Sequence, residues 1–146
     1  MFSKSCIYGI QAMSYIAQKS GERDYTGLKE ISEDRHIPLH YLSKVLQILV
    51  KHKILKSAKG NKGGFSLARD PEKINLLEII DAIDGLDNFN SCVIGLKECS
   101  SESACPVHEQ YKTFQEELRK NFTEKNFRSL VEDIKKGKSF DPLPWR

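Results

Sequence analysis

The sequence has no long apolar run, few cysteines and few histidines, and each of these shortages narrows what the chain does. Among its 146 residues no stretch approaches the roughly 18–20 apolar residues of a membrane span. Its first six residues do not contain the apolar core of a signal peptide. Without an export signal, the four cysteines are expected to be thiols or metal ligands rather than disulfides. We therefore expect a cytoplasmic protein that does not contact membranes.

The four histidines stand apart, at positions 36, 40, 52 and 108. None of them forms a nucleophile–base constellation of the kind that catalysis needs, so an enzyme is not expected. Apolar residues make up 39% and charged residues 29% of the chain, which is typical of a folded domain with one modest core. This composition excludes a disordered or collagen-like chain.

Acidic residues are absent from one long window. Residues 35–69 contain no Asp or Glu, although the whole chain carries 20 of them. A solvated face normally mixes both signs, so a purely basic window indicates a polyanionic partner. The alternative is chance clustering in a lysine-rich chain. The basic residues of the window are Arg35, Lys44, Lys51, Lys53, Lys56, Lys59, Lys62 and Arg69.

Three helices are predicted in the first part of the chain, at about residues 4–19, 26–32 and 38–52, where apolar residues recur at helical spacing. A short turn joins the second to the third, which begins near Pro38 and has a basic outer face. This arrangement is typical of a helix-turn-helix reader of DNA. The alternative is an ordinary amphipathic helix with a solvated face. In the third helix the apolar stripe is Tyr41, Leu42, Val45, Leu46 and Leu49, and the outer face is His40, Ser43, Lys44, Gln47 and Lys51.

A short hairpin is predicted directly after the third helix. Its strands are expected at 54–58 and 65–67, and its turn, 59–64, is rich in glycine and lysine. Such a hairpin is a wing, whose glycines let the turn lie close to a sugar-phosphate backbone. A nucleotide-binding phosphate loop is excluded, because that loop needs a helix after its glycines. The residues expected to contact a double-stranded DNA operator are His40, Ser43, Lys44, Gln47, Lys51, Lys56, Lys59, Asn61, Lys62 and Gly63.

The rest of the chain predicts a fourth helix at about 75–84, an irregular stretch at 86–104, a long helix from Pro106 and a last helix at about 124–136. The long helix carries an apolar stripe that projects from an already complete small domain, which suggests a dimerisation helix. The residues expected at that interface are Tyr111, Phe114, Leu118 and Phe122. We therefore predict a mainly α fold with a small β-hairpin. Its parts are a winged helix-turn-helix domain (1–85), a cysteine-containing sensor loop (86–105), dimerisation helices (106–136) and an extended tail (137–146).

The irregular stretch and the start of the long helix gather three of the four cysteines and one histidine. Cys92, Cys99, Cys105 and His108 lie within 17 residues. Soft thiolates with one imidazole suit an iron–sulfur cluster or zinc. The gaps between the cysteines are wider than in common zinc knuckles, which favours the bulkier cluster. The alternative is a set of simple surface thiols with an incidental histidine. Cys6, in the apolar first helix, is expected in the core.

Together these motifs resemble the Rrf family of winged-helix regulators, typified by the iron–sulfur cluster regulator IscR and the nitric-oxide sensor NsrR. The resemblance extends to about residue 135, and the cysteine motif is similar to that of the cluster-bearing branch. The matching segments are Tyr8-Gly9, Tyr15-Ile16-Ala17, the reader at 37–42, the wing at 60–69, the segment 77–85 and the motif Cys-x6-Cys-x5-Cys-Pro-Val-His.

The resemblance implies a homodimeric bacterial transcriptional regulator, with repression the expected mode. It implies that His40, Ser43 and Lys44 read bases and that Lys59 contacts DNA from the wing. The loop would hold a [2Fe–2S] or [4Fe–4S] cluster that senses redox state, nitric oxide or iron–sulfur supply.

The sequence departs from the family in three ways. The first cysteine gap is six residues rather than five, and the reader carries His and Lys where relatives can have amides or carboxylates. Some relatives take a cluster ligand from a carboxylate of the partner's first helix, but here no Asp or Glu precedes Glu22, which favours His108.

Two other functions remain open at this point. A winged-helix regulator without a cluster would use its thiols to sense oxidants or to hold structural zinc, and such a protein would be colourless. A small redox or scaffold protein would use the basic window to bind an acidic protein partner, and an operator-length duplex would not compete for that surface.

Overall fold

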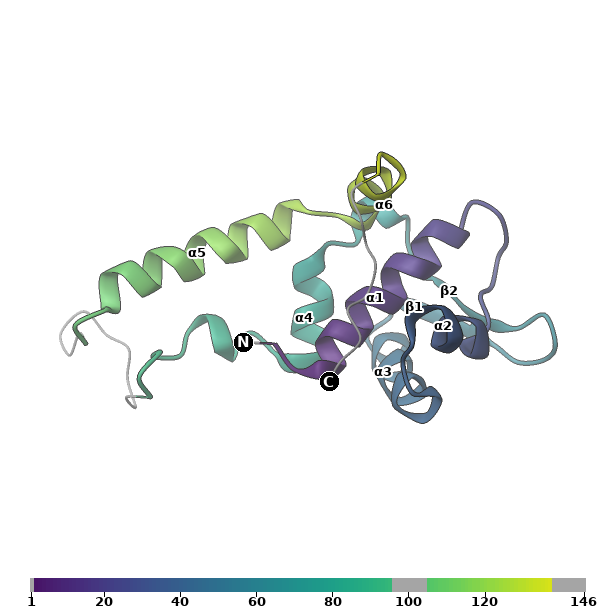
Figure 1. Cartoon of the computed structure of the whole chain (residues 1–146), viewed down its shortest axis with the longest axis horizontal. Coiled ribbons are helices and arrows are strands. Elements are labelled where there is room, and N and C mark those ends of the chain that lie inside the picture. The colour runs from purple at the N-terminus through teal and green to yellow at the C-terminus, as the bar shows by residue number, and fades with distance from the viewer. Residues whose placement is uncertain (1, 96–104, 138–146) are drawn as a thin grey trace.

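Six α-helices and a two-stranded hairpin make up the part of the chain that the computed structural model describes, residues 2–95 and 105–137 (Figure 1). This mainly helical fold with one small hairpin confirms the predicted fold class. In these two ranges, no helix has the length and apolar character that a membrane span requires. The elements are α1 (Lys4–Lys19), α2 (Leu28–Arg35), α3 (Leu39–Lys51), β1 (Leu55–Ala58), β2 (Gly64–Leu67), α4 (Leu76–Asp84), α5 (His108–Glu124) and α6 (Phe127–Lys135), with 3-10 turns at Pro71–Lys73 and Asp87–Phe89.

Helix α1 runs through the centre of the molecule, with the bounds that the sequence predicts. Ser3 caps it, because its hydroxyl accepts a hydrogen bond from the Cys6 N–H at 3.0 Å. Met13 is fully buried, since α3, α4 and α6 all pack against this helix. A Cβ at Gly9 would lie 2.4 Å from the Ile83 side chain of α4. A side chain at this position would therefore require the terminal methyl of Ile83 to move.

A tight turn joins α2 to α3. His36 adopts the left-handed conformation (φ 53°) and Ile37, the next residue, is buried. The Ser32 hydroxyl donates a hydrogen bond to the Ile37 carbonyl at 2.6 Å, and the Ile37 N–H donates to the Ser32 carbonyl at 3.1 Å. These two bonds fix the direction in which α3 leaves α2, as a helix-turn-helix requires.

Helix α3 differs from its prediction in two details. Pro38 is the N-cap rather than a residue of the first turn. Tyr41 was expected in the buried stripe, and that prediction is wrong, because its side chain is 42% exposed. Successive residues are about 100° apart around a helix, so Tyr41 lies at the flank of the stripe, where its ring makes a T-shaped contact with the Tyr8 ring at 5.8 Å between centroids. The predicted apolar residues Leu42, Val45, Leu46 and Leu49 are all buried.

The wing is anchored to the helical body through the loop before α2. Its strands pair antiparallel, from Leu55 opposite Leu67 to Ala58 opposite Gly64. Thr26 adds two hydrogen bonds at the base: its N–H donates to the Phe65 carbonyl at 2.9 Å, and its carbonyl accepts from the Phe65 N–H at 2.8 Å. The base of the wing is therefore held, while its turn extends away from the helices (Figure 1).

Replacing Gly64 with alanine is expected to destabilise the protein by about 1–3 kcal/mol. Gly64 has φ +135°, and a Cβ there would lie 2.2 Å from the Thr26 carbonyl oxygen, so the loop that anchors the wing would have to move. The free energy of unfolding from urea titration measures this effect. Gly21→Ala is the matched control, since no atom lies within 4 Å of the added Cβ. Equal stability of the two variants would contradict the anchoring role of the Thr26 contact.

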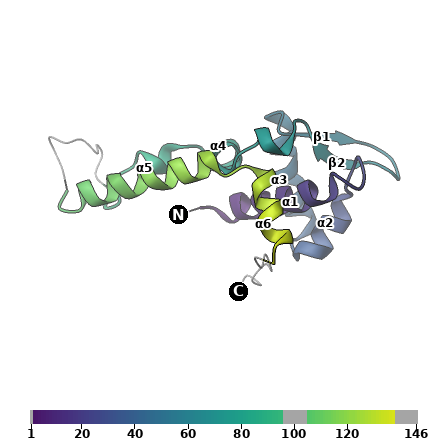
Figure 2. The same ribbon diagram turned by 90° about the horizontal axis from the view of Figure 1, so that it is seen from above.

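An elongated arm extends from α4 and α5. Asn75 and Glu78 form the predicted capping box at the start of α4, and Gly85 ends that helix. The chain then runs outward beside α5, which returns toward the body (Figures 1 and 2). Helix α5 starts at His108, two residues later than predicted, with Val107 as its N-cap.

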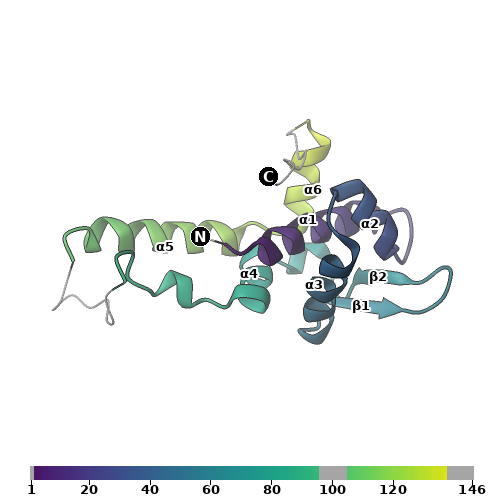
Figure 3. The ribbon, with the colours of Figure 1, turned by 60° about the horizontal axis from the view of Figure 1, so that its bottom comes forward.

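Helix α6 turns its apolar face to α1, on the side opposite α3 (Figure 3). Phe127 is fully buried, and its N–H donates to the Ile74 carbonyl at 3.0 Å. The Leu76 N–H donates to the Lys125 carbonyl, also at 3.0 Å. Of the two helices predicted for dimerisation, α6 is thus part of the winged-helix core. The predicted tail lies, from residue 138 onward, outside the described residues.

Candidate nucleic-acid interface and cysteine site

The outer face of α3 is free of contacts with the protein core. His40, Lys44, Gln47 and Lys51 are exposed and Ser43 is partly exposed, while the opposite side of the helix is buried. The face therefore presents amide, hydroxyl, imidazole and ammonium groups, which hydrogen-bond to base edges and phosphates. The hairpin adjoins the same helix, since α3 packs against β1 (Figure 3). The predicted reader and wing thus form one continuous region.

The structure removes two residues from the predicted basic window. Arg35 is buried, with its Nε 3.0 Å from a carboxylate oxygen of Asp34 and its guanidinium 5.2 Å from the Tyr15 ring centroid. Arg69 binds Glu78 at 2.7 Å. Among the residues that the structure describes, the other basic residues of the window form no ion pair. They are Lys44, Lys51, Lys53, Lys56, Lys59 and Lys62, all of them exposed.

The tip of the wing carries exposed polar groups. Lys59, Asn61 and Lys62 are exposed, and Gly63 is partly exposed. Lys56, on β1, lies with its Nζ 5.9 Å from the centroid of the Tyr25 ring, so its ammonium stays on the loop side of the wing. This arrangement suits contact with a polyanion, because in the described ranges none of these lysines forms an ion pair with a carboxylate.

The cysteine site is divided between the two segments of the arm, the chain that follows α4 and the start of α5. Cys105 and His108 are buried at the start of α5, where the His108 N–H donates to the Cys105 carbonyl at 3.0 Å. Cys92 is partly exposed and begins a turn that the Gly95 N–H closes on the Cys92 carbonyl at 3.1 Å. Cys99 lies outside the described residues. In the described ranges no three His, Cys, Asp or Glu side chains are grouped as a metal site.

The chemistry of this donor set fits a thiophilic metal centre. Thiolate and imidazole are ligands of zinc and of iron–sulfur clusters, and burial of Cys105 and His108 would shield a bound group from water. The sequence predicts that Cys105 lies near the N-cap of the long helix, but the cap is Val107, so Cys105 precedes the helix by three residues. Its position is set instead by the Cys105–His108 turn.

Gln115 is a site residue that sequence reasoning missed. Its side-chain amide donates to the Asn88 carbonyl at 3.0 Å and to the Ser91 carbonyl at 3.3 Å, and the side chain is 7% exposed. The amide therefore holds the chain just before Cys92 against α5. The one available signal was spacing, because position 115 is seven residues after His108 and shares its helical face.

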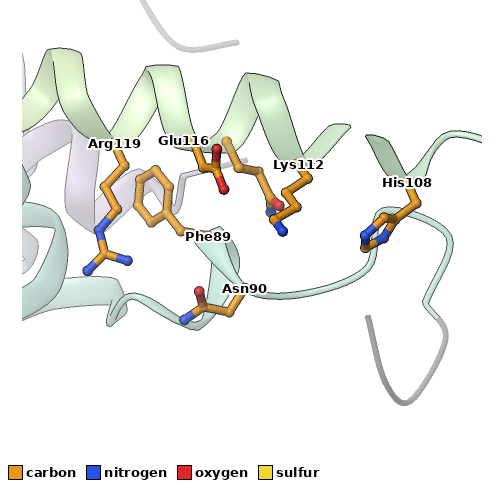
Figure 4. A pocket seen from close by; sticks show the side chains of 7 residues that line it. Phe89, Asn90, His108, Lys112, Glu116 and Arg119 are labelled. Carbon is orange, nitrogen blue, oxygen red and sulfur yellow. The ribbon is translucent and has the colours of Figure 1, made fainter. Parts of the chain in front are cut away.

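A groove of about 340 Å³ lies between α5 and the segment that follows α4 (Figure 4). Buried His108 lies at one end and Arg119 at the other, and the Phe89 ring forms an apolar wall. The lining residues are Phe89, Asn90, His108, Lys112, Gln115, Glu116 and Arg119.

The predicted dimerisation stripe divides along α5. Leu118 and Phe122 pack on a small core formed by Cys6, Ile80 and Phe89 at the base of the arm. Phe114, nearer the tip, is 47% exposed, and the Tyr111 ring stacks on it with centroids 6.4 Å apart. The outer half of the stripe is thus available to a partner.

Cys6 is fully buried, as predicted. Burial, and secondarily the nearby Asp84 carboxylate, raise the pKa of its thiol to about 12. Cys6 is therefore a core residue with little thiolate character at neutral pH.

Comparisons with known proteins agree with this architecture. Residues 2–133 match the model of the Rrf2 family, described as an iron-dependent transcriptional regulator. A putative HTH-type transcriptional regulator of Aquifex aeolicus is 28% identical over 133 residues, which cover 90% of this chain and 91% of that protein. The HTH-type transcriptional regulator IscR of Sodalis glossinidius is 34% identical over 69% of this chain and 60% of its own length.

Solved structures show the same fold. CymR, the global cysteine regulator of B. subtilis, superposes with a TM-score of 0.77 at 25% identity, covering 91% of this chain and 97% of that one. T. potens IscR superposes with a TM-score of 0.76 at 24% identity, covering 95% and 91%.

Proposed function

Because the chain belongs to the Rrf2 family of transcriptional regulators, we propose that it binds a double-stranded DNA operator as a homodimer and senses redox state, nitric oxide or iron–sulfur supply. Family membership confirms the predicted winged-helix regulator and the prediction that the chain is not an enzyme. It also argues against a redox or scaffold protein. Assignment to the cluster-bearing branch, with repression as the mode, is part of the proposal.

The observation that carries DNA binding is the set of exposed lysines on α3 and the wing without carboxylate partners in the described ranges. Lys51, Lys56, Lys59 and Lys62 would contact phosphates and supply affinity, because such contacts release counterions from DNA. His40, Ser43, Lys44 and Gln47 would read base edges in the major groove. Asn61 and Gly63 would bring the wing turn close to the backbone.

In this proposal Cys92, Cys99, Cys105 and His108 hold an iron–sulfur cluster. A bound cluster would supply a reversible change of charge and ligation that oxidants or nitric oxide can trigger. The chain's own contribution is to bury Cys105 and His108 at the start of α5 and to hold the Cys92 end of the loop beside the same helix. Since Leu118 and Phe122 of α5 pack on Cys6 of α1 and Ile80 of α4, α5 would connect changes in the loop to the winged-helix domain.

For the homodimer we propose α5 as the shared element, with Tyr111, Phe114, Leu118 and Phe122 as the interface set. The exposed side chains of Phe114 on α5 and of Val107 at its N-cap support this. In the same proposal residues 1–85 bind DNA, 86–105 sense the signal and 106–136 connect the two subunits.

A second candidate is a regulator without a cluster, which uses its thiols directly or binds zinc. The likeness to CymR, described as a global cysteine regulator, favours it. The two candidates differ in colour, because iron–sulfur clusters absorb visible light and zinc or bare thiols do not. The deciding experiment is a visible absorption spectrum, with iron and sulfide analysis, of protein purified without oxygen.

Replacing Lys44 with alanine is expected to change which DNA sequence is bound. A side chain that reads a base edge contributes about 1–3 kcal/mol of discrimination at one base pair, so the preference at one position of each half-site should relax. Duplexes selected from a random pool by wild type and variant measure this change, and His40→Ala is a parallel case. Lys136→Ala, an exposed lysine after α6 on the side opposite α3, is the control. A selected sequence identical to that of wild type for both reader variants would contradict the reader assignment.

A further inference from the structure

We infer that Gln115 is a positioning residue for Cys92, and that it holds the start of the cysteine loop on α5 before any metal or cluster is bound. The inference rests on the proposed function of the cysteine loop. It adds a residue that belongs to no part of the predicted ligand set.

Gln115 holds the backbone of residues 88–91 on α5 through two hydrogen bonds, which we call the Gln115 clamp. A side-chain amide has two N–H groups, and here the amide nitrogen donates to two carbonyls of one loop, those of Asn88 and Ser91. Because the side chain is only 7% exposed, water competes poorly for these bonds. The two bonds join α5 to residues 27 and 24 positions earlier in the chain, so losing the amide would release this segment from the helix.

The clamp acts on the residue that needs positioning. Ser91 directly precedes Cys92, whereas the next anchor toward the N-terminus is the buried ring of Phe89. Asn90 and Ser91 are themselves exposed, so their side chains do not bury the segment. The two Gln115 hydrogen bonds therefore tie the backbone just before Cys92 to α5.

The same helix carries the other half of the site. His108 is the first residue of α5, and Gln115 is seven residues further on, about 10 Å along the helix axis. Figure 4 shows the chain beyond Asn90 running along α5 toward His108. Gln115 therefore connects the segment before Cys92 to the helix that carries His108. This connection lowers the conformational entropy that the chain loses when its ligands are ordered around a bound group.

The test compares Gln115→Leu, which keeps a similar volume without donors, with Gln110→Leu, an exposed position on the same helix. Both are made in a Cys99→Ser background, and the alkylation of Cys92 by iodoacetamide is followed by mass spectrometry in metal-free protein. Cys6, fully buried and with its pKa raised to about 12, should stay unmodified. We expect Cys92 to react about tenfold faster in Gln115→Leu and at the wild-type rate in Gln110→Leu.

A second readout is the affinity for Co²⁺ in the background with all cysteines present. Loss of a supporting residue outside the ligand set typically weakens metal binding about 10–100-fold, so we expect at least a tenfold loss in Gln115→Leu and none in Gln110→Leu. If the leucine variant does not fold, Gln115→Glu replaces it, since this side chain has the same size but only acceptors.

The outcomes separate this inference from the proposed function. Cys92 reactivity that is unchanged in both Gln115 variants would overturn the inference, whatever the metal result. Failure of wild type to bind Co²⁺ would count against the metal site, while faster alkylation of Cys92 in Gln115→Leu would still support the clamp.

Discussion

A Cys105→Ala variant purified without oxygen is expected to be colourless and to contain at most about a tenth of the wild-type iron. Cys105 is the buried thiol nearest the start of α5, and its carbonyl fixes the turn to His108. Replacing it removes a buried thiol ligand from the site, beside His108. Visible absorption and iron and sulfide analysis measure the loss.

Cys6→Ala is the matched control for this prediction. Cys6 lies fully buried in the small core at the base of the arm, and its replacement should leave the colour unchanged. A Cys105→Ala protein as brown as wild type would contradict the assignment of Cys105 as a ligand. A colourless wild type that takes up no iron and sulfide on reconstitution would favour the thiol or zinc candidate, with the winged helix retained.

Reversing two charges at the wing tip, by Lys59→Glu and Lys62→Glu together, is expected to weaken DNA binding on the order of 100-fold at moderate salt. Both lysines are exposed and meet no carboxylate within the described ranges, so their charge is available to phosphates. The slope of log affinity against log salt concentration should also become shallower, by about two for each wing, because each subunit loses two phosphate contacts. Fluorescence anisotropy over a range of salt concentrations measures both quantities.

The loss should be similar for all DNA sequences, because phosphate contacts carry no sequence information directly. Lys136→Glu serves as the control, since this exposed lysine follows α6 on the side of α1 opposite α3. An unchanged affinity and salt slope in the double variant would show that the hairpin does not contact DNA. A loss restricted to one sequence would instead assign base reading to the wing.

Local chemistry accounts for the parts of the fold that the sequence predicted well. The bounds of α1 and the capping box of Asn75 and Glu78 depend on neighbours within four residues, which the sequence displays directly. The errors at Tyr41 and at the start of α5 are of one turn or less. The error at Tyr41 arises because the edge of a buried stripe depends on what packs against it, here the Tyr8 ring.

Which of the predicted site residues stay available to a partner depends more strongly on tertiary structure. Arg69 is neutralised by Glu78, nine residues away, and Arg35 by burial beside Asp34 and Tyr15, so both leave the basic window. The apolar stripe of α5 reads as one interface in sequence, but Leu118 and Phe122 contact the core at the base of the arm. Only folding reveals which part of a stripe is already covered.

From the sequence alone came the winged helix-turn-helix, the basic reader and wing, and the grouping of thiols near His108, because helical period, turn residues and charge are properties of short segments. The tertiary structure decided which charges stay unpaired, which apolar residues stay exposed, and that Gln115 clamps a carbonyl 24 residues away. Hydrogen bonds and ion pairs between remote segments form only when the fold brings them within about 3 Å. Spacing along the chain does not encode that distance.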